Sequence, residues 1–205
     1  MNIAGLLVSF ALLIIAMTVH EFAHGWVAYK LGDTTAKYAG RLTLNPLAHI
    51  DPIGTVVLPL FLFIATGGQF VFGAAKPVPI NYWALKNPKR DMALIGISGP
   101  LANFLFALVL TVIFKLLPTS ANIDFVLRNL IFINVILGVF NLLPIPPLDG
   151  SRILAGILPA NLASKYSAIE PYGFIIVILL IWMGMIDYLI WPAVNLVLKL
   201  LTLPF

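Results

Sequence analysis

An HExxH motif, His20-Glu21-Phe22-Ala23-His24, lies near the start of the chain. Residues i and i+4 of a helix share a face, so the two imidazoles can point at one metal ion. Glu21 lies about 100° round the helix from His20, beside such a site, where a carboxylate can take a proton from metal-bound water. The motif therefore predicts the centre of a zinc hydrolase, and catalytic zinc requires a third protein ligand.

Four side chains are candidates for that third ligand, namely His49, Asp51, Asp149 and Asp187. The chain has no cysteine, which excludes thiolate ligands. His49 is the only other histidine, and composition alone favours it. Asp149 follows a proline-rich break at the end of an apolar run, and unwound backbone at membrane depth is tolerated where it lines a cavity or packs in protein. Asp149 is also suited to capping a helix expected from about Ser151.

The composition of the 205 residues is that of a membrane protein. Hydrophobic residues make up 61% and charged residues 10%, whereas soluble domains have roughly 45–50% apolar and about 25% charged residues. We expect an all-α polytopic membrane protein with about four to six transmembrane helices. The 12 Lys and Arg residues are spread along the chain, a distribution that fits loops facing anionic lipid and no nucleic-acid partner.

The apolar runs predict the spanning helices of one membrane domain, residues 1–205. These runs cover residues 3–19, with helix continuing to about Lys30, then 92–117, 125–143 and 173–201, the last interrupted at Asp187 and Pro192. A short amphipathic helix is expected over about 151–158. Gly96, Gly99 and Pro100 open the 92–117 run, where we expect irregular, close-packed backbone. The first run is predicted to be a retained helix, because it has neither a basic start nor a small-residue cleavage site.

Basic residues predict which ends of these helices face the cytoplasm. They follow the first helix (Lys30, Lys37, Arg41) and precede the 92–117 run (Lys86, Lys89, Arg90). His20 and Asp149 then share a depth only if residues 52–81 cross the membrane an even number of times. We therefore expect a re-entrant unit beside the metal, with a helix over about 52–64 and an extended return over 72–79. The simpler alternative is a connecting loop.

Three segments resemble the site-2 protease family of intramembrane zinc metalloproteases. They are HEFAH at 20–24, GPLAN at 99–103 and NLLPIPPLDG at 141–150, in the order and spacing of that family. Residues 41–51 also resemble the small bacterial and archaeal members. The resemblance covers nearly the whole chain and is to the small prokaryotic type, without the PDZ or CBS domains of larger relatives.

The resemblance implies a role for five residues. One Zn²⁺ per chain would be held by His20, His24 and Asp149, with Glu21 as general base. Asn141 would position the substrate or stabilise the oxyanion.

The function that follows is an intramembrane zinc metalloendopeptidase, which hydrolyses peptide bonds within or near transmembrane segments. Its expected partners are the lipid bilayer and single-span membrane proteins, such as anti-sigma factors or signal-peptide remnants. We expect a multi-pass protein of the cell membrane with its active site towards the cytoplasm. A metal transporter is one alternative, and it predicts several ligand-rich spans. A non-catalytic relative that binds membrane helices is the other, and it predicts the loss of Glu21 or of a ligand.

Overall fold

The computed structural model describes residues 3–65, 75–118 and 120–201. Over these residues the chain forms helices, turns and loops, and no strand is present. The α-helices are α1 (Ile3–Lys30), α2 (Thr35–Tyr38), α3 (Leu58–Ala65), α4 (Pro88–Leu116), α5 (Ala121–Asn141), α6 (Asp149–Ile157), α7 (Ala160–Ser167), α8 (Gly173–Trp182) and α9 (Met185–Leu200). Short 3-10 turns cover Pro46–His49, Tyr82–Ala84 and Glu170–Tyr172, and a π-helix covers Pro52–Val57.

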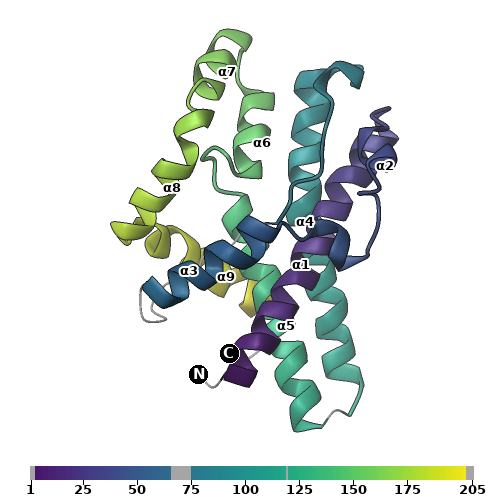
Figure 1. The fold of residues 1–205 in the computed structure, drawn as a ribbon, viewed down its shortest axis with the longest axis vertical. Coiled ribbons are helices and arrows are strands. Elements are labelled where there is room, and N and C mark those ends of the chain that lie inside the picture. The colour runs from purple at the N-terminus through teal and green to yellow at the C-terminus, as the bar shows by residue number, and fades with distance from the viewer. Residues whose placement is uncertain (1–2, 66–74, 119, 202–205) are drawn as a thin grey trace.

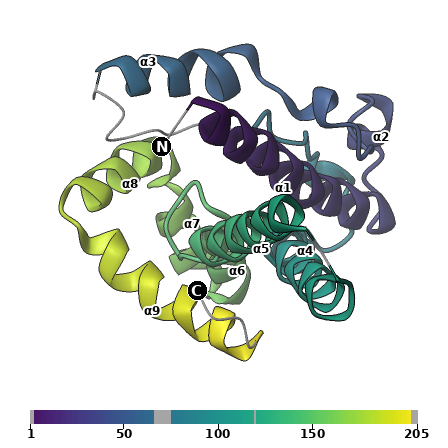
Figure 2. The same cartoon turned by 90° about the horizontal axis from the view of Figure 1, so that it is seen from below.

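Helices α1, α4 and α5 pack against one another at the centre of the molecule (Figures 1 and 2). Among the described residues, four helical stretches are long and apolar enough to cross a membrane: 7–30, 88–116, 121–141 and 160–182. At about 1.5 Å per residue, α4 alone measures about 43 Å, more than the roughly 30 Å hydrocarbon core. The chain is therefore an all-α, multi-pass membrane protein, as the composition predicts.

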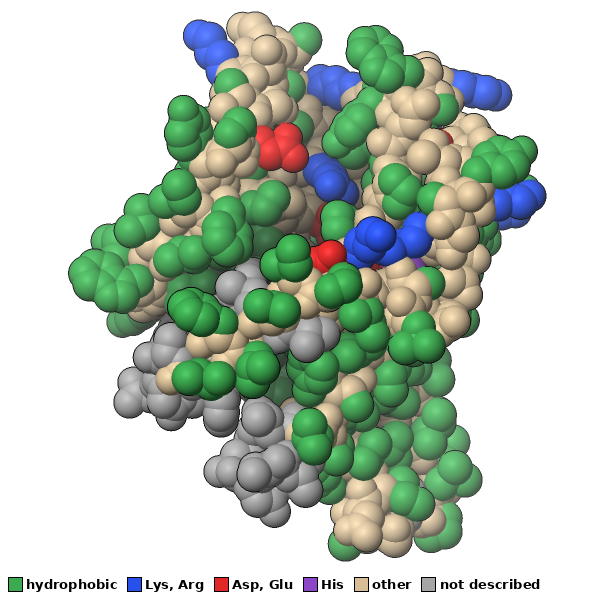
Figure 3. All heavy atoms as spheres, in the orientation of Figure 1, with side chains coloured by type: hydrophobic (Ala, Val, Ile, Leu, Met, Phe, Trp, Pro, Cys, Tyr) green, Lys and Arg blue, Asp and Glu red, His purple; other side chains and the backbone are tan. Residues whose placement is uncertain are grey.

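The helices bury polar side chains and expose apolar ones. Asn103 and Asn134 are completely buried, whereas Leu105 and Leu116 are exposed. Hydrophobic side chains cover the lower part of the face in Figure 3, and Lys and Arg gather in its upper part. A soluble protein has the opposite arrangement, so this surface suits a lipid environment with polar groups at one end.

Three glycine and proline residues that were expected at the start of a helix lie inside α4 and do not unwind it. The helix begins at Pro88, and Gly96, Gly99 and Pro100 follow within regular helix. The expected irregular backbone is therefore wrong, because one proline removes a single helical hydrogen bond and neighbouring groups can make good that loss. The expected close packing is confirmed, since a Cβ on Gly96 would lie 3.0 Å from the backbone oxygen of Asp149.

The segment after His49 contains the predicted helix and returns to lie beside His49. The π-helix and α3 confirm a helix over 52–64. The first part of the expected return, 72–74, lies outside the described residues, and 75–81 runs without helix or strand. The Lys76 amide donates to the His49 carbonyl at 3.0 Å. The chain therefore returns beside His49 after α3, and an even number of membrane crossings stays a prediction.

The C-terminal apolar run is broken at a glycine. Helices α8 and α9 are separated at Gly184, whose φ of 68° lies in the left-handed region that only glycine adopts at little cost. Asp187 and Pro192 interrupt the apolar run in the sequence, but both lie within α9 and neither ends the helix. The side chain of Asp187 lies outside the part of the chain that the structure describes.

Candidate active site

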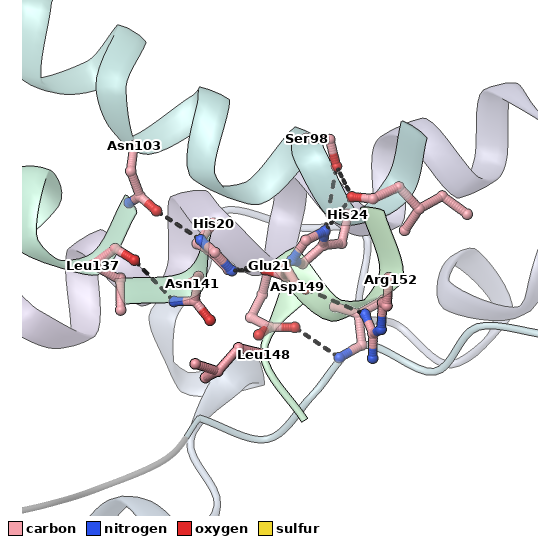
Figure 4. Close-up of polar contacts among 12 residues, drawn as sticks. His20, Glu21, His24, Ser98, Asn103, Leu137, Asn141, Leu148, Asp149 and Arg152 are labelled. Carbon is pink, nitrogen blue, oxygen red and sulfur yellow. Dashed lines mark hydrogen bonds and ion pairs between the residues drawn. The ribbon is translucent and has the colours of Figure 1, made fainter. Parts of the chain in front are cut away.

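His20 and His24 of α1 meet Asp149 at the start of α6 (Figure 4). The Oδ2 atom of Asp149 lies 2.9 Å from Nε2 of His20 and 3.0 Å from Nε2 of His24. The two imidazole nitrogens are 3.0 Å apart, and all three side chains are buried. Residues separated by 125 positions in the sequence thus aim three donor atoms at one point.

This donor set fits a metal ion. The three ligand atoms all lie within 4.8 Å of one another. Among the described residues, no other group of three or more His, Asp or Glu side chains is arranged in this way. Two imidazole nitrogens and one carboxylate oxygen form a ligand set typical of catalytic zinc, which keeps its fourth position open for water or substrate.

The backbone before Asp149 places its carboxylate at this point. Residues 142–148 are unwound and carry three prolines, and α6 then begins at Asp149. A Cβ on Gly150 would lie 2.2 Å from the Leu142 carbonyl oxygen, so only glycine fits there. The Oδ2 atom of Asp149 then faces both imidazoles, and the ionised carboxylate is the form that binds a cation.

Glu21 lies beside the three donors and contacts the returning segment. The backbone amide of Val78 donates to its Oε2 atom at 2.8 Å. Both residues line a cavity of about 130 Å³ together with His20, His24, Asn141, Asp149 and Arg152. The sequence prediction that the return would lie beside the metal-binding residues is thus confirmed for the described residues 75–81.

Asn141, the last residue of α5, also lines this cavity. Its Nδ2 atom donates to the Leu137 carbonyl at 3.0 Å, within its own helix. An amide nitrogen carries two hydrogens, so this contact leaves one hydrogen for another acceptor. The structure places Asn141 where the sequence predicts it, and its catalytic role remains a prediction.

His49 and Asp51 lie outside the group of three donors. Nε2 of the buried His49 bonds to the Thr43 carbonyl at 2.9 Å. The Oδ2 atom of Asp51 accepts from the Gly54 amide at 2.6 Å. Each of these side chains therefore bonds to nearby backbone. Composition alone favoured His49 as the third ligand, but the third member of the cluster is Asp149.

Other polar groups contact the ring nitrogens of His20 and His24 that face away from Asp149, and sequence patterns assign these groups no role. Nδ1 of His20 lies 2.6 Å from Oδ1 of Asn103, and Nδ1 of His24 lies 2.7 Å from the Ile95 carbonyl. Ser98 donates to that same carbonyl at 2.6 Å. Asn103 is part of the GPLAN segment, and its amide within an apolar span was the signal that could have identified it.

We predict that Gly99→Ala disrupts the cluster of His20, His24 and Asp149. An added Cβ would lie 2.5 Å from Nε2 of His24 and 2.6 Å from Nε2 of His20, too close for either ring to stay in place. Overpacking of this kind costs about 1–3 kcal/mol, so we expect zinc affinity to fall about 5- to 150-fold. Zinc titration checks this, with Leu101→Ala on the same helix as control, because that side chain is half-exposed. Unchanged zinc affinity in Gly99→Ala would contradict this geometry.

A multi-pass helical protein in which two histidines of an HExxH motif and an aspartate converge among the helices belongs to the class of membrane metallohydrolases. Comparison with protein families makes this specific. The model described as "Peptidase family M50" matches residues 8–120 and 117–184. The chain belongs to this family.

Relatives of the chain carry consistent names. "Putative zinc metalloprotease YwhC" of Bacillus subtilis (strain 168) is 38% identical over 192 residues, which cover 89% of this chain and 84% of the relative. Rip2 of Mycolicibacterium smegmatis, named in the same way, is 33% identical over 89% of this chain and 66% of its own length. "Zinc metalloprotease MJ0392" of Methanocaldococcus jannaschii is 30% identical over 74% of this chain and 34% of its own length. No solved structure matches the chain significantly.

Family and relatives together identify the chain as a zinc metalloprotease, a hydrolase that uses Zn²⁺. This assignment favours the enzyme over the transporter. It also favours the enzyme over a non-catalytic relative, because Glu21 and all three donors are present.

Proposed function

We propose that this metalloprotease cleaves peptide bonds within or near transmembrane segments of single-span membrane proteins, such as anti-sigma factors or signal-peptide remnants. One observation supports this most directly. The donors of His20, His24 and Asp149 are buried among helices that are long and apolar enough to cross a membrane. A substrate has to reach that centre at membrane depth.

The proposal assigns a role to each side chain around the cavity. His20, His24 and Asp149 hold Zn²⁺, which when bound polarises a carbonyl and makes water a better nucleophile. Glu21 removes the proton from the attacking water and passes it to the leaving amine. Asn141 donates its remaining amide hydrogen near the oxyanion that develops on the scissile carbonyl.

We place the active site towards the cytoplasmic side of the cell membrane. His20 lies roughly 26 Å along α1 from Ile3 at 1.5 Å per residue, towards the end that carries Lys30. Arg90, near the start of α4, lines one cavity together with Lys30, so basic residues of both helices lie at the same end of the molecule. Positive charge marks the cytoplasmic end of spanning helices.

The returning segment 75–81 is our candidate contact for an unwound substrate. Its amides already have partners inside the protein: Lys76 donates to His49, Val78 to Glu21, and Asn81 to Oδ2 of Asp33 at 2.6 Å. Carbonyls on its other edge can accept hydrogen bonds from an extended peptide by strand addition. A helical substrate keeps its amides bonded within itself, so it has to unwind first.

We predict that Val78→Pro slows cleavage without releasing zinc. Proline has no amide hydrogen, and a hydrogen bond to a charged group is worth about 1.5–3 kcal/mol. Losing the bond to Glu21 should lower kcat about tenfold or more. Val78→Ala is the control, because it keeps the amide and removes only the buried side chain. Equal rates for the two variants would show that the amide does not orient Glu21.

The purified enzyme and a model single-span protein in detergent test the proposed function. One substrate carries a helix-breaking Gly-Pro pair in its span, and a matched one carries Leu-Leu. We expect cleavage of the first at a clearly higher rate, together with loss of activity on zinc removal and its return on zinc addition. Cleavage of soluble unfolded peptides alone, with neither span cut, would contradict the proposal.

A further inference from the structure

Two buried asparagines connect α5 and α4 to a histidine of α1. Asn103 and Asn134 are completely buried, and Nδ2 of Asn103 donates to Oδ1 of Asn134 at 2.8 Å. Asn103 in turn contacts His20 (Figure 4). We propose that Asn103 and Asn134 are positioning residues, which fix the proton and the ring orientation of His20 for zinc. This inference rests on the zinc centre of the proposed function.

The direction of each hydrogen bond follows from groups that can only accept. Asn134 Nδ2 lies 2.8 Å from the Leu130 carbonyl, so its Oδ1 has to face Asn103. Asn103 Nδ2 lies 3.1 Å from the Ala16 carbonyl and also reaches Oδ1 of Asn134. Both amide hydrogens of Asn103 are therefore used, and its Oδ1 is turned towards His20. The amide orientation is set by the whole chain of contacts.

An oxygen at this position decides the state of the His20 ring. The Oδ1 atom of Asn103 accepts from Nδ1 of His20 at 2.6 Å, so Nδ1 carries the proton. The lone pair of Nε2 is then free and faces Asp149 and His24. Outer contacts of this kind fix the tautomer and orientation of metal-binding histidines.

His24 does not depend on a side chain in the same way. Its Nδ1 donates to the backbone carbonyl of Ile95 at 2.7 Å, which stays in place whatever residue stands at 95. Ser98 Oγ lies farther from this nitrogen, at 3.3 Å. We therefore predict that substitutions of Asn103 and Asn134 affect zinc through His20 and leave the bond between His24 and Ile95 in place.

The burial of the two amides adds to the argument. A polar side chain in an apolar span is costly and usually functional. Asn129 on α5 gives a direct comparison. Its Nδ2 donates to the Phe125 carbonyl at 2.7 Å, four residues back, as Asn134 does to Leu130, but Asn129 is only partly buried. Asn129 and Asn134 thus make the same bond to their own helix. Asn134 differs because its side chain also accepts a hydrogen bond from Asn103.

Zinc affinity of the purified full chain, measured by competition with a chromophoric chelator, tests the proposal. The variants are Asn103→Leu, Asn103→Asp and Asn134→Leu, with Asn129→Leu as matched control. The melting temperature of each metal-free protein is recorded alongside. No substrate is present, so failure of this inference is distinct from failure to cleave membrane proteins.

We expect Asn103→Leu to weaken zinc binding about 10–100-fold, the range for outer contacts of metal ligands. Asn103→Asp should recover most of the affinity, because a carboxylate still accepts from Nδ1 of His20. Asn134→Leu should weaken binding less, since the contact between Asn103 and His20 remains. Asn129→Leu should bind zinc as the wild type does.

Two results would overturn the proposal. One is wild-type zinc affinity in Asn103→Leu. The other is equal loss in Asn103→Leu and Asn103→Asp, with lowered melting temperatures of both metal-free proteins, which would show that Asn103 only fills space. Should Asn103→Leu not fold, Asn134→Leu decides in its place, and unchanged zinc affinity there would equally overturn the proposal.

Discussion

Glu21→Gln should remove cleavage and leave zinc in place. Glutamine keeps the shape of the side chain and can still contact the Val78 amide through its oxygen, but it cannot accept a proton from water at neutral pH. General base catalysis contributes about 10²–10⁴-fold, so we expect kcat to fall by at least about a hundredfold. Zinc content should equal that of the wild type, because Glu21 is outside the three converging donors.

The chain offers a matched control for this variant. Glu170 is the one other glutamate in the sequence, and it lies exposed at the 3-10 turn before α8. Glu170→Gln makes the same chemical change away from the metal-binding donors and should cleave at the wild-type rate. Initial rates on the Gly-Pro span substrate, with zinc measured in each sample, make the comparison. Glu21→Gln cleaving as fast as Glu170→Gln would remove the proposed mechanism.

Asp149→Ala should lose both zinc and activity. Its Oδ2 atom lies about equally close to the two histidine nitrogens, at 2.9 and 3.0 Å, and alanine leaves only two donors. Changing an outer contact typically costs 10–100-fold in affinity, and removing a direct ligand should cost about a hundredfold or more. Competition with a chelator measures the loss of zinc affinity, and the rate of cleavage of the span substrate should fall with it.

The variant His49→Ala tests whether Asp149 or His49 is the third zinc ligand. His49 contacts Thr43 through Nε2 and lies outside the donor cluster, so its variant should keep wild-type zinc affinity even if its melting temperature falls. The reverse outcome, with zinc kept in Asp149→Ala and lost in His49→Ala, would show that the third ligand is wrong.

Local sequence patterns predicted the helices that carry the site. The apolar run from Ile3 to Lys30 became α1, and i,i+4 spacing placed His20 and His24 on one face, because both features depend on residues close in sequence. Charge bias and the requirement for a shared depth predicted the return of the chain after α3, which the contact between Lys76 and His49 confirms.

Long-range packing decided what the sequence left open. Spacing alone could not choose between His49 and Asp149, because the answer depends on how the unwound residues 142–148 direct α6 towards α1. The pairing of Asn103 with Asn134 needs α4 and α5 in their packed register. The break at Gly184 depends on a left-handed backbone angle that hydropathy does not encode.

Mapping the scissile bond in a membrane tests the central claim most directly. The enzyme and a single-span substrate are reconstituted together in liposomes, and the masses of the products locate the cut, with Glu21→Gln as the inactive reference. The account predicts a bond within or at the edge of the apolar span, in its cytoplasmic half. A zinc-loaded enzyme that cuts only in the water-exposed flanks, far from the span, would contradict it.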